Sequence, residues 1–258
     1  MPKALVINPN TTAAMTADIG LHATRVFTPP WDCEVIQPRG GPQSIESWVD
    51  MYISTVAMLD LLKDHGDADG ILIACFGDPG LFALREIVDV PVVGLAEANF
   101  FTACMLGLRF GVIAVLKKDA AGIENLLWTY GLEKRCAGLQ TIDLTVLDMH
   151  QSHAKTLAML VQASLALADK GAEVLVLGCA GLSGFRQELE SQAGLPVIEP
   201  VEAACWQLRS LVELGLRTSR AGLFAKPSPK QLTDIDSILA KHLGEWLKTQ
   251  TEQGFNRD

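Results

Sequence analysis

The chain has 258 residues, of which 49% are hydrophobic and 20% are charged, and its formal net charge is −9. This composition provides enough apolar side chains for a large folded core and is unlike that of a disordered chain. The acidic excess argues against a nucleic-acid-binding protein, because that function depends on clustered Lys and Arg side chains that neutralise phosphates.

Membrane and secretory signals are also missing from the sequence. No segment approaches the roughly 20 consecutive apolar residues of a membrane span, and the apolar run at residues 4–7 is too short for a signal peptide. The six cysteines are widely spaced, which argues against a disulfide framework. We therefore expect a cytoplasmic protein with no membrane partner. A mean hydropathy of +0.24 and five tryptophans predict buried subunit contacts, and hence a homo-oligomer. We expect a tetramer or a hexamer, although the composition does not fix the number of subunits.

Short runs rich in Val and Ile alternate along the chain with longer segments of helical periodicity. This pattern is typical of strand–helix–strand units and a buried parallel sheet. The predicted strands are residues 4–7, 34–37, 71–74, 92–95, 110–115, 141–144, 174–178 and 197–199. The predicted helices are residues 12–26, 44–64, 81–88, 97–106, 120–130, 153–170, 185–192, 203–214 and 231–250. The expected fold class is α/β, with four strands in each half of the chain.

The first half is predicted to span residues 1–105 and the second residues 106–217. Residues 218–258 are expected to complete the first half, with a returning strand at 221–224 and an amphipathic helix at 231–250.

Two near-copies of one short passage contain Cys75 and Cys179. Residues 68–77 read ADGILIACFG, and residues 172–181 read AEVLVLGCAG. Each copy is followed by a Pro-Val-Val or Pro-Val-Ile segment and then by Glu-Ala. The duplication predicts two related halves, each with one thiol at the same structural position.

The surroundings of these cysteines indicate acid–base chemistry. Both are predicted at the carboxyl ends of parallel strands, where ligands bind in open sheets. The glycine-containing turns at 77–80 and 181–184 can expose backbone N–H groups at a helix start, which lower a thiol pKa and hold an oxyanion. Two thiols facing one another across a pseudo-twofold axis can remove a proton from one face of a carbon acid and return it to the other, without metal or organic cofactor.

The remaining cysteines and histidines are given structural interpretations. Free cysteine usually behaves as a small hydrophobe, and we assign that role to Cys33, Cys104, Cys136 and Cys205. Neither Cys75 nor Cys179 has a Cys or His partner at the spacing of a zinc ligand pair. The His150 and His153 pair is interpreted as surface or helix-capping, and no Gly-x-Gly-x-x-Gly motif is present. We therefore predict no metal and no cofactor.

The sequence resembles the aspartate/glutamate/hydantoin racemase superfamily, and most closely its hydantoin and allantoin racemase branch. The resemblance is carried by INPNTT at 7–12, GPQSIES at 41–47, ACFGDPGL at 74–81, PVVG at 91–94, LGCAG at 177–181, PVIEP at 196–200 and GLRTS at 215–219. It implies two α/β subdomains related by a pseudo-twofold axis, with the active site between them. It also implies 1,1-proton transfer in which Cys75 and Cys179 alternate as base and acid.

The implied substrate is a hydantoin-type cyclic ureide substituted at C5, with allantoin as one candidate. The implied substrate-binding residues are Asn8, Gly41, Pro42, Ser44, Phe76, Gly77, Ala180 and Gly181. One segment departs from the family pattern: relatives commonly end the strand at 110–115 in threonines, whereas this chain reads VIAVL at 112–116. That departure favours a substrate less charged than an amino-acid carboxylate.

Other interpretations stay open. A maleate isomerase or an arylmalonate-type decarboxylase would belong to the same superfamily, although the decarboxylase needs only one of the two cysteines. A non-catalytic two-lobed ligand-binding protein would give no reason for a thiol at both strand ends, although a fold alone never proves catalysis. A thiol-redox role would fit less well, because no Cys-x-x-Cys arrangement is present.

Overall fold

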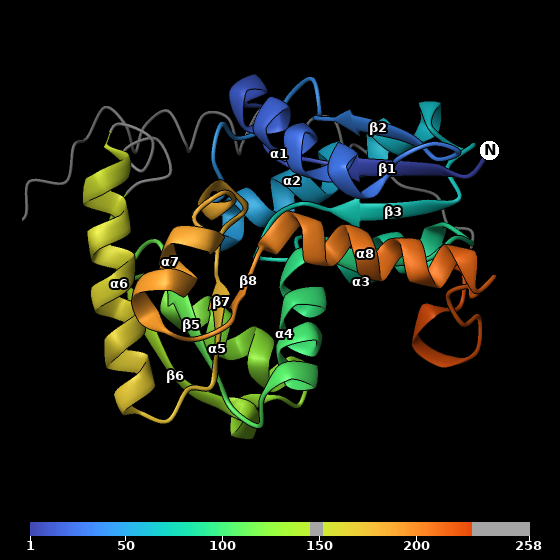
Figure 1. Ribbon diagram of the computed structural model, residues 1–258. Coiled ribbons are helices and arrows are strands. Elements are labelled where there is room, and N and C mark those ends of the chain that lie inside the picture. Colours follow the sequence, from blue (N-terminus) through green and yellow to red (C-terminus); the bar gives the residue numbers. More distant parts are fainter. Residues whose placement is uncertain (145–151, 229–258) are drawn as a thin grey trace, which may run out of the picture. The chain divides into compact units, whose positions relative to one another are not determined.

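The computed structural model describes residues 1–144 and 152–228, and it confirms the predicted α/β architecture. Eight parallel strands form two four-stranded sheets of equivalent order, β2-β1-β3-β4 and β6-β5-β7-β8 (Figure 1). The strands are β1 (Lys3–Ile7), β2 (Asp32–Ile36), β3 (Gly70–Ile73), β4 (Val92–Gly94), β5 (Phe110–Ala114), β6 (Cys136–Thr141), β7 (Val174–Leu177) and β8 (Val197–Ile198).

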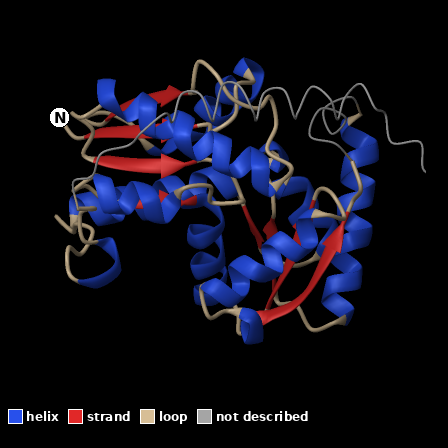
Figure 2. Ribbon diagram, turned by 180° about the vertical axis from the view of Figure 1, so that it is seen from behind, coloured by secondary structure: helices blue, strands red, loops and turns tan. Residues whose placement is uncertain are grey.

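Helices connect the strands and cover both faces of each sheet (Figure 2). They are α1 (Ala13–Val26), α2 (Trp48–Leu61), α3 (Leu81–Ile87), α4 (Leu95–Leu106), α5 (Asp119–Thr129), α6 (His153–Asp169), α7 (Arg186–Ala193) and α8 (Pro200–Glu213). Within the described residues, no helix combines the length and apolar composition needed to cross a membrane.

The alternation of side chains along the buried strands builds separate cores on the two faces of the first sheet. On β1, Leu5 and Ile7 pack with Met58 of α2 and Leu84 of α3, while the intervening Val6 belongs to the core beneath α1 and α8. Both faces of a parallel sheet are covered by helices, so the strand is apolar along its whole length.

The two halves share one of these cores. Phe100 of α4 is fully buried, and its ring lies 5.3 Å from that of Phe76 in the first half and 5.5 Å from that of Phe110 on β5 in the second. The inner faces of both sheets therefore contribute to one continuous apolar cluster.

Helix α8 follows the second sheet in the chain but packs on the first. It contacts α1, α4, β3 and β4. Gly70 makes room for this helix, because a Cβ at that position would lie 2.7 Å from Leu208 Cδ1. The close approach brings the end of the second sheet against α1.

Several predicted elements need correction. The segment 221–224 is not a strand: Gly222–Phe224 is a 3₁₀ helix, and it returns to the first half through the Phe82 and Phe224 rings, 5.8 Å apart. The strand predicted at 141–144 lies earlier in the chain, at Cys136–Thr141, because pairing with β5 holds a segment whose apolar pattern is weak. The helix predicted at 231–250 and the residue His150 lie outside the described residues.

Candidate active site

Cys75 and Cys179 lie just beyond the carboxyl ends of β3 and β7, which hold the same position in the two sheets. Both residues line one pocket of about 640 Å³. Its walls come from both halves and include residues of α2, α3 and α5. The duplicated passage thus brings the two cysteines to a single cavity.

The surroundings of both thiols favour the protonated form. Burial raises the pKa of the Cys75 thiol to about 12 and the pKa of the Cys179 thiol to about 11. The backbone N–H of Gly77 lowers the Cys75 pKa, and that of Gly181 lowers the Cys179 pKa. A negative charge on Cys179 would raise the Cys75 pKa further. At neutral pH both thiols therefore hold their protons, and each has a backbone donor ready for its thiolate.

Apolar and aromatic side chains make up most of the pocket wall. Trp48, Met51 and Tyr52 come from α2, and Phe82 comes from α3. The pocket also contains Asp119 at the start of α5, and its charge raises the pKa of both thiols. Lys118 and Glu46 also line the pocket and form an ion pair with one another at 3.4 Å, so the carboxylate of Asp119 adds negative charge that disfavours an anionic ligand.

Asp78, which sequence reasoning did not single out, holds the turn that follows Cys75. Its Oδ1 accepts a 2.9 Å bond from the Ala96 N–H, and its Oδ2 accepts bonds from the Glu97 N–H and the Tyr130 hydroxyl at 2.9 and 2.7 Å. Burial raises the pKa of Asp78 to about 7, although these three donors lower it. The carboxyl group ties the cysteine turn to the start of α4 and, through the hydroxyl, to the second half.

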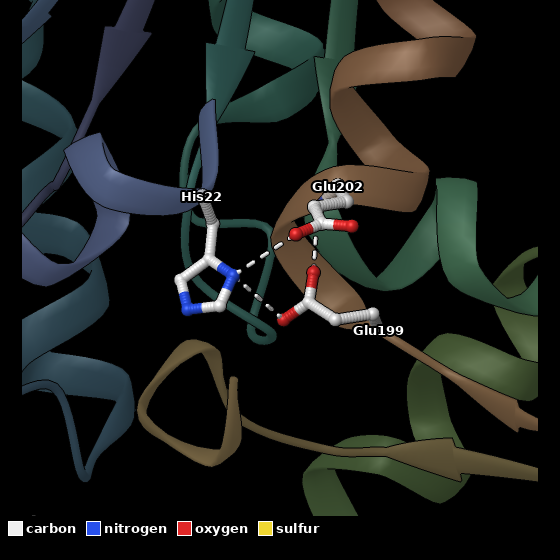
Figure 3. Close-up of side chains that lie close together, drawn as sticks. All are labelled: His22, Glu199 and Glu202. Atoms are coloured by element: carbon white, nitrogen blue, oxygen red, sulfur yellow. Dashed lines mark hydrogen bonds and ion pairs between the residues drawn. The ribbon is translucent and has the colours of Figure 1, made fainter. Parts of the chain in front are cut away.

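The second half places a carboxyl group beside its cysteine loop in a different way. Glu199 occupies the strand-end position that Gly94 holds in the first half. A Cβ at Gly94 would lie 2.5 Å from the carboxyl carbon of Asp78, so a larger residue does not fit there. Glu199 caps α8 by accepting a 2.7 Å bond from the Glu202 N–H. His22 of α1 faces both glutamates (Figure 3).

Half of the predicted backbone donors lie in the pocket wall. Phe76 and Gly77 line the pocket. Ala180 and Gly181 belong to the 3₁₀ helix η4 (Ala180–Leu182), and neither is among the described residues that line it.

The other predicted binding residues lie apart from the pocket lining in the described structure. Asn8 is buried, and its amide nitrogen donates a 2.9 Å bond to the side chain of Asn10. Gly41, Pro42 and Ser44 do not line the pocket either, whereas the segment that follows them directly does. The loop thus approaches the site through Ile45, Glu46 and Ser47, at the end of the same GPQSIES motif, instead of through the three residues that were predicted.

The other four cysteines lie away from the pocket. Cys205 is buried in the core shared by both halves, and Cys33, Cys104 and Cys136 pack against that core. Within the described residues, none of these four lines the cavity.

Comparison with protein families matches residues 5–208 to the model described as Asp/Glu/Hydantoin racemase. The chain belongs to this racemase family. A hydantoin racemase from Pseudomonas sp. (strain NS671) is 38% identical over 232 residues, which cover 89% of this chain and 93% of that protein.

Two solved structures agree with this assignment. An allantoin racemase from Klebsiella pneumoniae is 38% identical, with a TM-score of 0.84 and coverage of 91% of this chain and 97% of its own. An allantoin racemase from Pseudomonas fluorescens is 34% identical, with a TM-score of 0.85 and coverage of 89% and 99%. The family member described here is therefore an isomerase of the hydantoin and allantoin racemase type, and the predicted family is confirmed.

Proposed function

We propose that the enzyme interconverts the two enantiomers of 5-substituted hydantoins by moving the C5 proton between Cys75 and Cys179. The thiolate of one cysteine removes the proton from one face of the ring, and the electron pair of the C–H bond passes into the adjacent carbonyl to form an enolate. The thiol of the other cysteine then donates its proton to the opposite face. Charge and protons balance, and the two cysteines finish with exchanged protonation states.

The observation that carries this proposal is the presence of both thiols in one pocket, each beside a backbone N–H donor. A hydantoin C5 proton lies between a carbonyl and a ring nitrogen, so it is more acidic than the α-proton of a zwitterionic amino acid. The ring is also neutral, which suits a pocket that contains the carboxyl group of Asp119. Relatives whose names include hydantoin racemase and allantoin racemase support the substrate class.

The pocket wall favours an apolar substituent at C5. Trp48 and Tyr52 lie one helical turn apart on α2, both exposed, and both line the cavity with Phe82. An aromatic or aliphatic substituent would bury this surface. The ureido group of allantoin is polar, and its N–H donors would face this apolar wall without hydrogen-bond partners. Each unpaired group costs about 1–3 kcal/mol.

The test is proton NMR in D₂O with enantiopure 5-benzylhydantoin and allantoin, following C5–H exchange and loss of optical rotation. We expect both signals to decay faster with enzyme than without it, and kcat/KM to be at least about tenfold higher for the benzyl compound. Trp48→Ala is expected to reduce this preference. Trp206→Ala is the matched control, because Trp206 is also 53% exposed but lies outside the pocket. If neither hydantoin loses its C5 proton above the uncatalysed rate, the proposal is refuted.

The raised thiol pKa values predict an alkaline pH dependence. The active form holds one thiolate and one thiol, so kcat/KM should rise with pH as the first proton leaves, near the Cys179 value of about 11. Between pH 7 and 8, below the range in which the imide N–H of the hydantoin ring ionises, we expect a rise of roughly tenfold per pH unit. The measurement is initial racemisation rate, corrected for the base-catalysed background, with circular dichroism at each pH to confirm folding. A rate that does not change between pH 7 and 8 would show that substrate or donors lower these thiol pKa values far more than the free site indicates.

A further inference from the structure

A second polar cluster lies outside the pocket, where α1 meets the start of α8. It consists of His22, Glu199 and Glu202 (Figure 3). His22 and Glu199 are each only 5% exposed, and Glu202 is partly exposed at one side. None of the three lines the cavity around the cysteines, so the proposed proton transfer does not use them.

The geometry of this cluster matches a small coordination sphere. His22 Nδ1 lies 3.3 Å from Glu202 Oε1 and 3.6 Å from Glu199 Oε1. The three ligand atoms all lie within 4.8 Å of one another. In a tetrahedral zinc site with metal–ligand bonds of about 2.0–2.1 Å, neighbouring ligand atoms are roughly 3.3–3.4 Å apart. The two distances from His22 Nδ1 are close to this value, and binding of a cation requires the two carboxylates to move closer together from their separation of at most 4.8 Å.

One ligand atom lacks a partner of its own. Glu199 Oε2 accepts the bond from the Glu202 N–H, but Glu199 Oε1 is buried and has no hydrogen-bond partner. The Ser183 hydroxyl in the cysteine loop is also buried and makes no hydrogen bond to this oxygen. A buried carboxylate oxygen in this condition needs a cation or a donor.

We propose that His22, Glu199 and Glu202 bind a divalent transition-metal cation of the zinc class. One imidazole nitrogen and two carboxylate oxygens form a ligand set that suits Zn²⁺, and water can fill the fourth position from the exposed side. The cation would join α1 of the first half to the start of α8 and would neutralise the buried carboxylates. Its role is structural, because the cluster lies outside the pocket.

Arg25 competes for the same site. Its guanidinium Nη1 donates a 2.9 Å bond to Glu202 Oε1 and lies 3.5 Å from His22 Nδ1. The Arg25 side chain is 64% exposed, so it can swing into solvent when a metal takes its place. Removing this guanidinium should therefore strengthen metal binding, which is a result that a damaged protein would not produce.

The test uses the full chain with Cys75→Ser and Cys179→Ser, which removes the pocket thiols as alternative metal ligands, beside the wild type. Metal-free protein is titrated with Co²⁺, whose visible spectrum separates nitrogen and oxygen ligands from thiolate, and thermal unfolding is followed with added Zn²⁺. We expect one equivalent bound without thiolate bands and a rise in Tm of roughly 5–10 °C at a hundredfold excess over Kd. We also expect His22→Gln to weaken binding at least tenfold, since it removes one of three ligands, and Arg25→Gln to strengthen it.

His65→Gln is the matched control. His65 Nδ1 also lies 3.3 Å from a glutamate oxygen, that of Glu34, but Glu34 is the only carboxylate paired with it in the described residues. This substitution should leave Co²⁺ and Zn²⁺ binding unchanged. Wild-type affinity in His22→Gln, or no Tm response to Zn²⁺ in folded protein, would overturn the proposal. Circular dichroism establishes folding for each variant.

Discussion

Replacing either Cys75 or Cys179 with serine is expected to abolish racemisation, with a loss of at least about 10³-fold in kcat. A serine hydroxyl holds its proton far more tightly than a thiol, so it can neither accept nor return the C5 proton at a useful rate. Each variant keeps one working cysteine. That cysteine can still remove and return a proton on its own face of the ring, so each variant should exchange deuterium into one enantiomer without inverting it.

The two variants should act on opposite enantiomers in this exchange, which proton NMR in D₂O with each pure enantiomer would show. Cys136→Ser is the control, because Cys136 is a partly buried thiol on β6 that does not line the pocket. It should leave both exchange and racemisation near wild-type rates. Full racemisation by either active-site variant would contradict a two-base mechanism, whereas complete loss of exchange in both would indicate that the thiols do not act separately.

The second large effect is expected at Asp78. Asp78→Ala leaves the buried N–H groups of Ala96 and Glu97 and the hydroxyl of Tyr130 without their acceptor. It also puts Ala at a φ of 44°, a conformation that Asp tolerates better. We expect the free energy of unfolding to fall by about 3–5 kcal/mol. Displacement of the Cys75 turn should lower kcat by about a hundredfold.

Urea denaturation of purified variants measures this loss, provided that the m-value is unchanged. Tyr130→Phe removes only the hydroxyl donor and should cost about 1 kcal/mol. Asp169→Ala, at the exposed end of α6, serves as the control and should change stability by less than about 0.5 kcal/mol. Wild-type stability in Asp78→Ala would mean that water or a neighbouring group replaces the carboxyl group in satisfying these donors.

The sequence predicted the part of the site that the duplication encodes. Cys75 and Cys179 follow apolar runs that form equivalent strands, so a comparison of the two copies was enough to pair them. Asp78 stood in the same glycine-containing turn, but the second copy has no acid at that place. A comparison of Gly94 with Glu199 could have revealed the role of Asp78. The first half places a carboxyl group in the turn after the cysteine, whereas the second half places one at the end of the following strand.

The pocket walls and the cluster around His22 could not be predicted in this way. Trp48 and Phe82 come from different helices, and His22 lies far along the chain from Glu199. Trp48 and Phe82 come together because α2 and α3 cover the same face of the first sheet, and His22 meets Glu199 because α8 packs against α1. Both arrangements depend on tertiary packing. The predicted position of β6 and the predicted strand at 221–224 were wrong for a similar reason. In both segments, pairing or contacts with distant elements outweighed the local sequence pattern.

The unequal surroundings of the two cysteines have a consequence for the kinetics of the proposed reaction. The two carboxyl groups that flank the cysteine loops are supplied by different positions, Asp78 in the turn of the first half and Glu199 at the strand end of the second. Free enantiomers of a hydantoin have equal energies in water, so the equilibrium constant between them is one and kcat/KM must be the same in both directions. The asymmetry of the protein can therefore appear only in kcat and KM taken separately: the enantiomer with the lower KM must also have the lower kcat, in the same proportion.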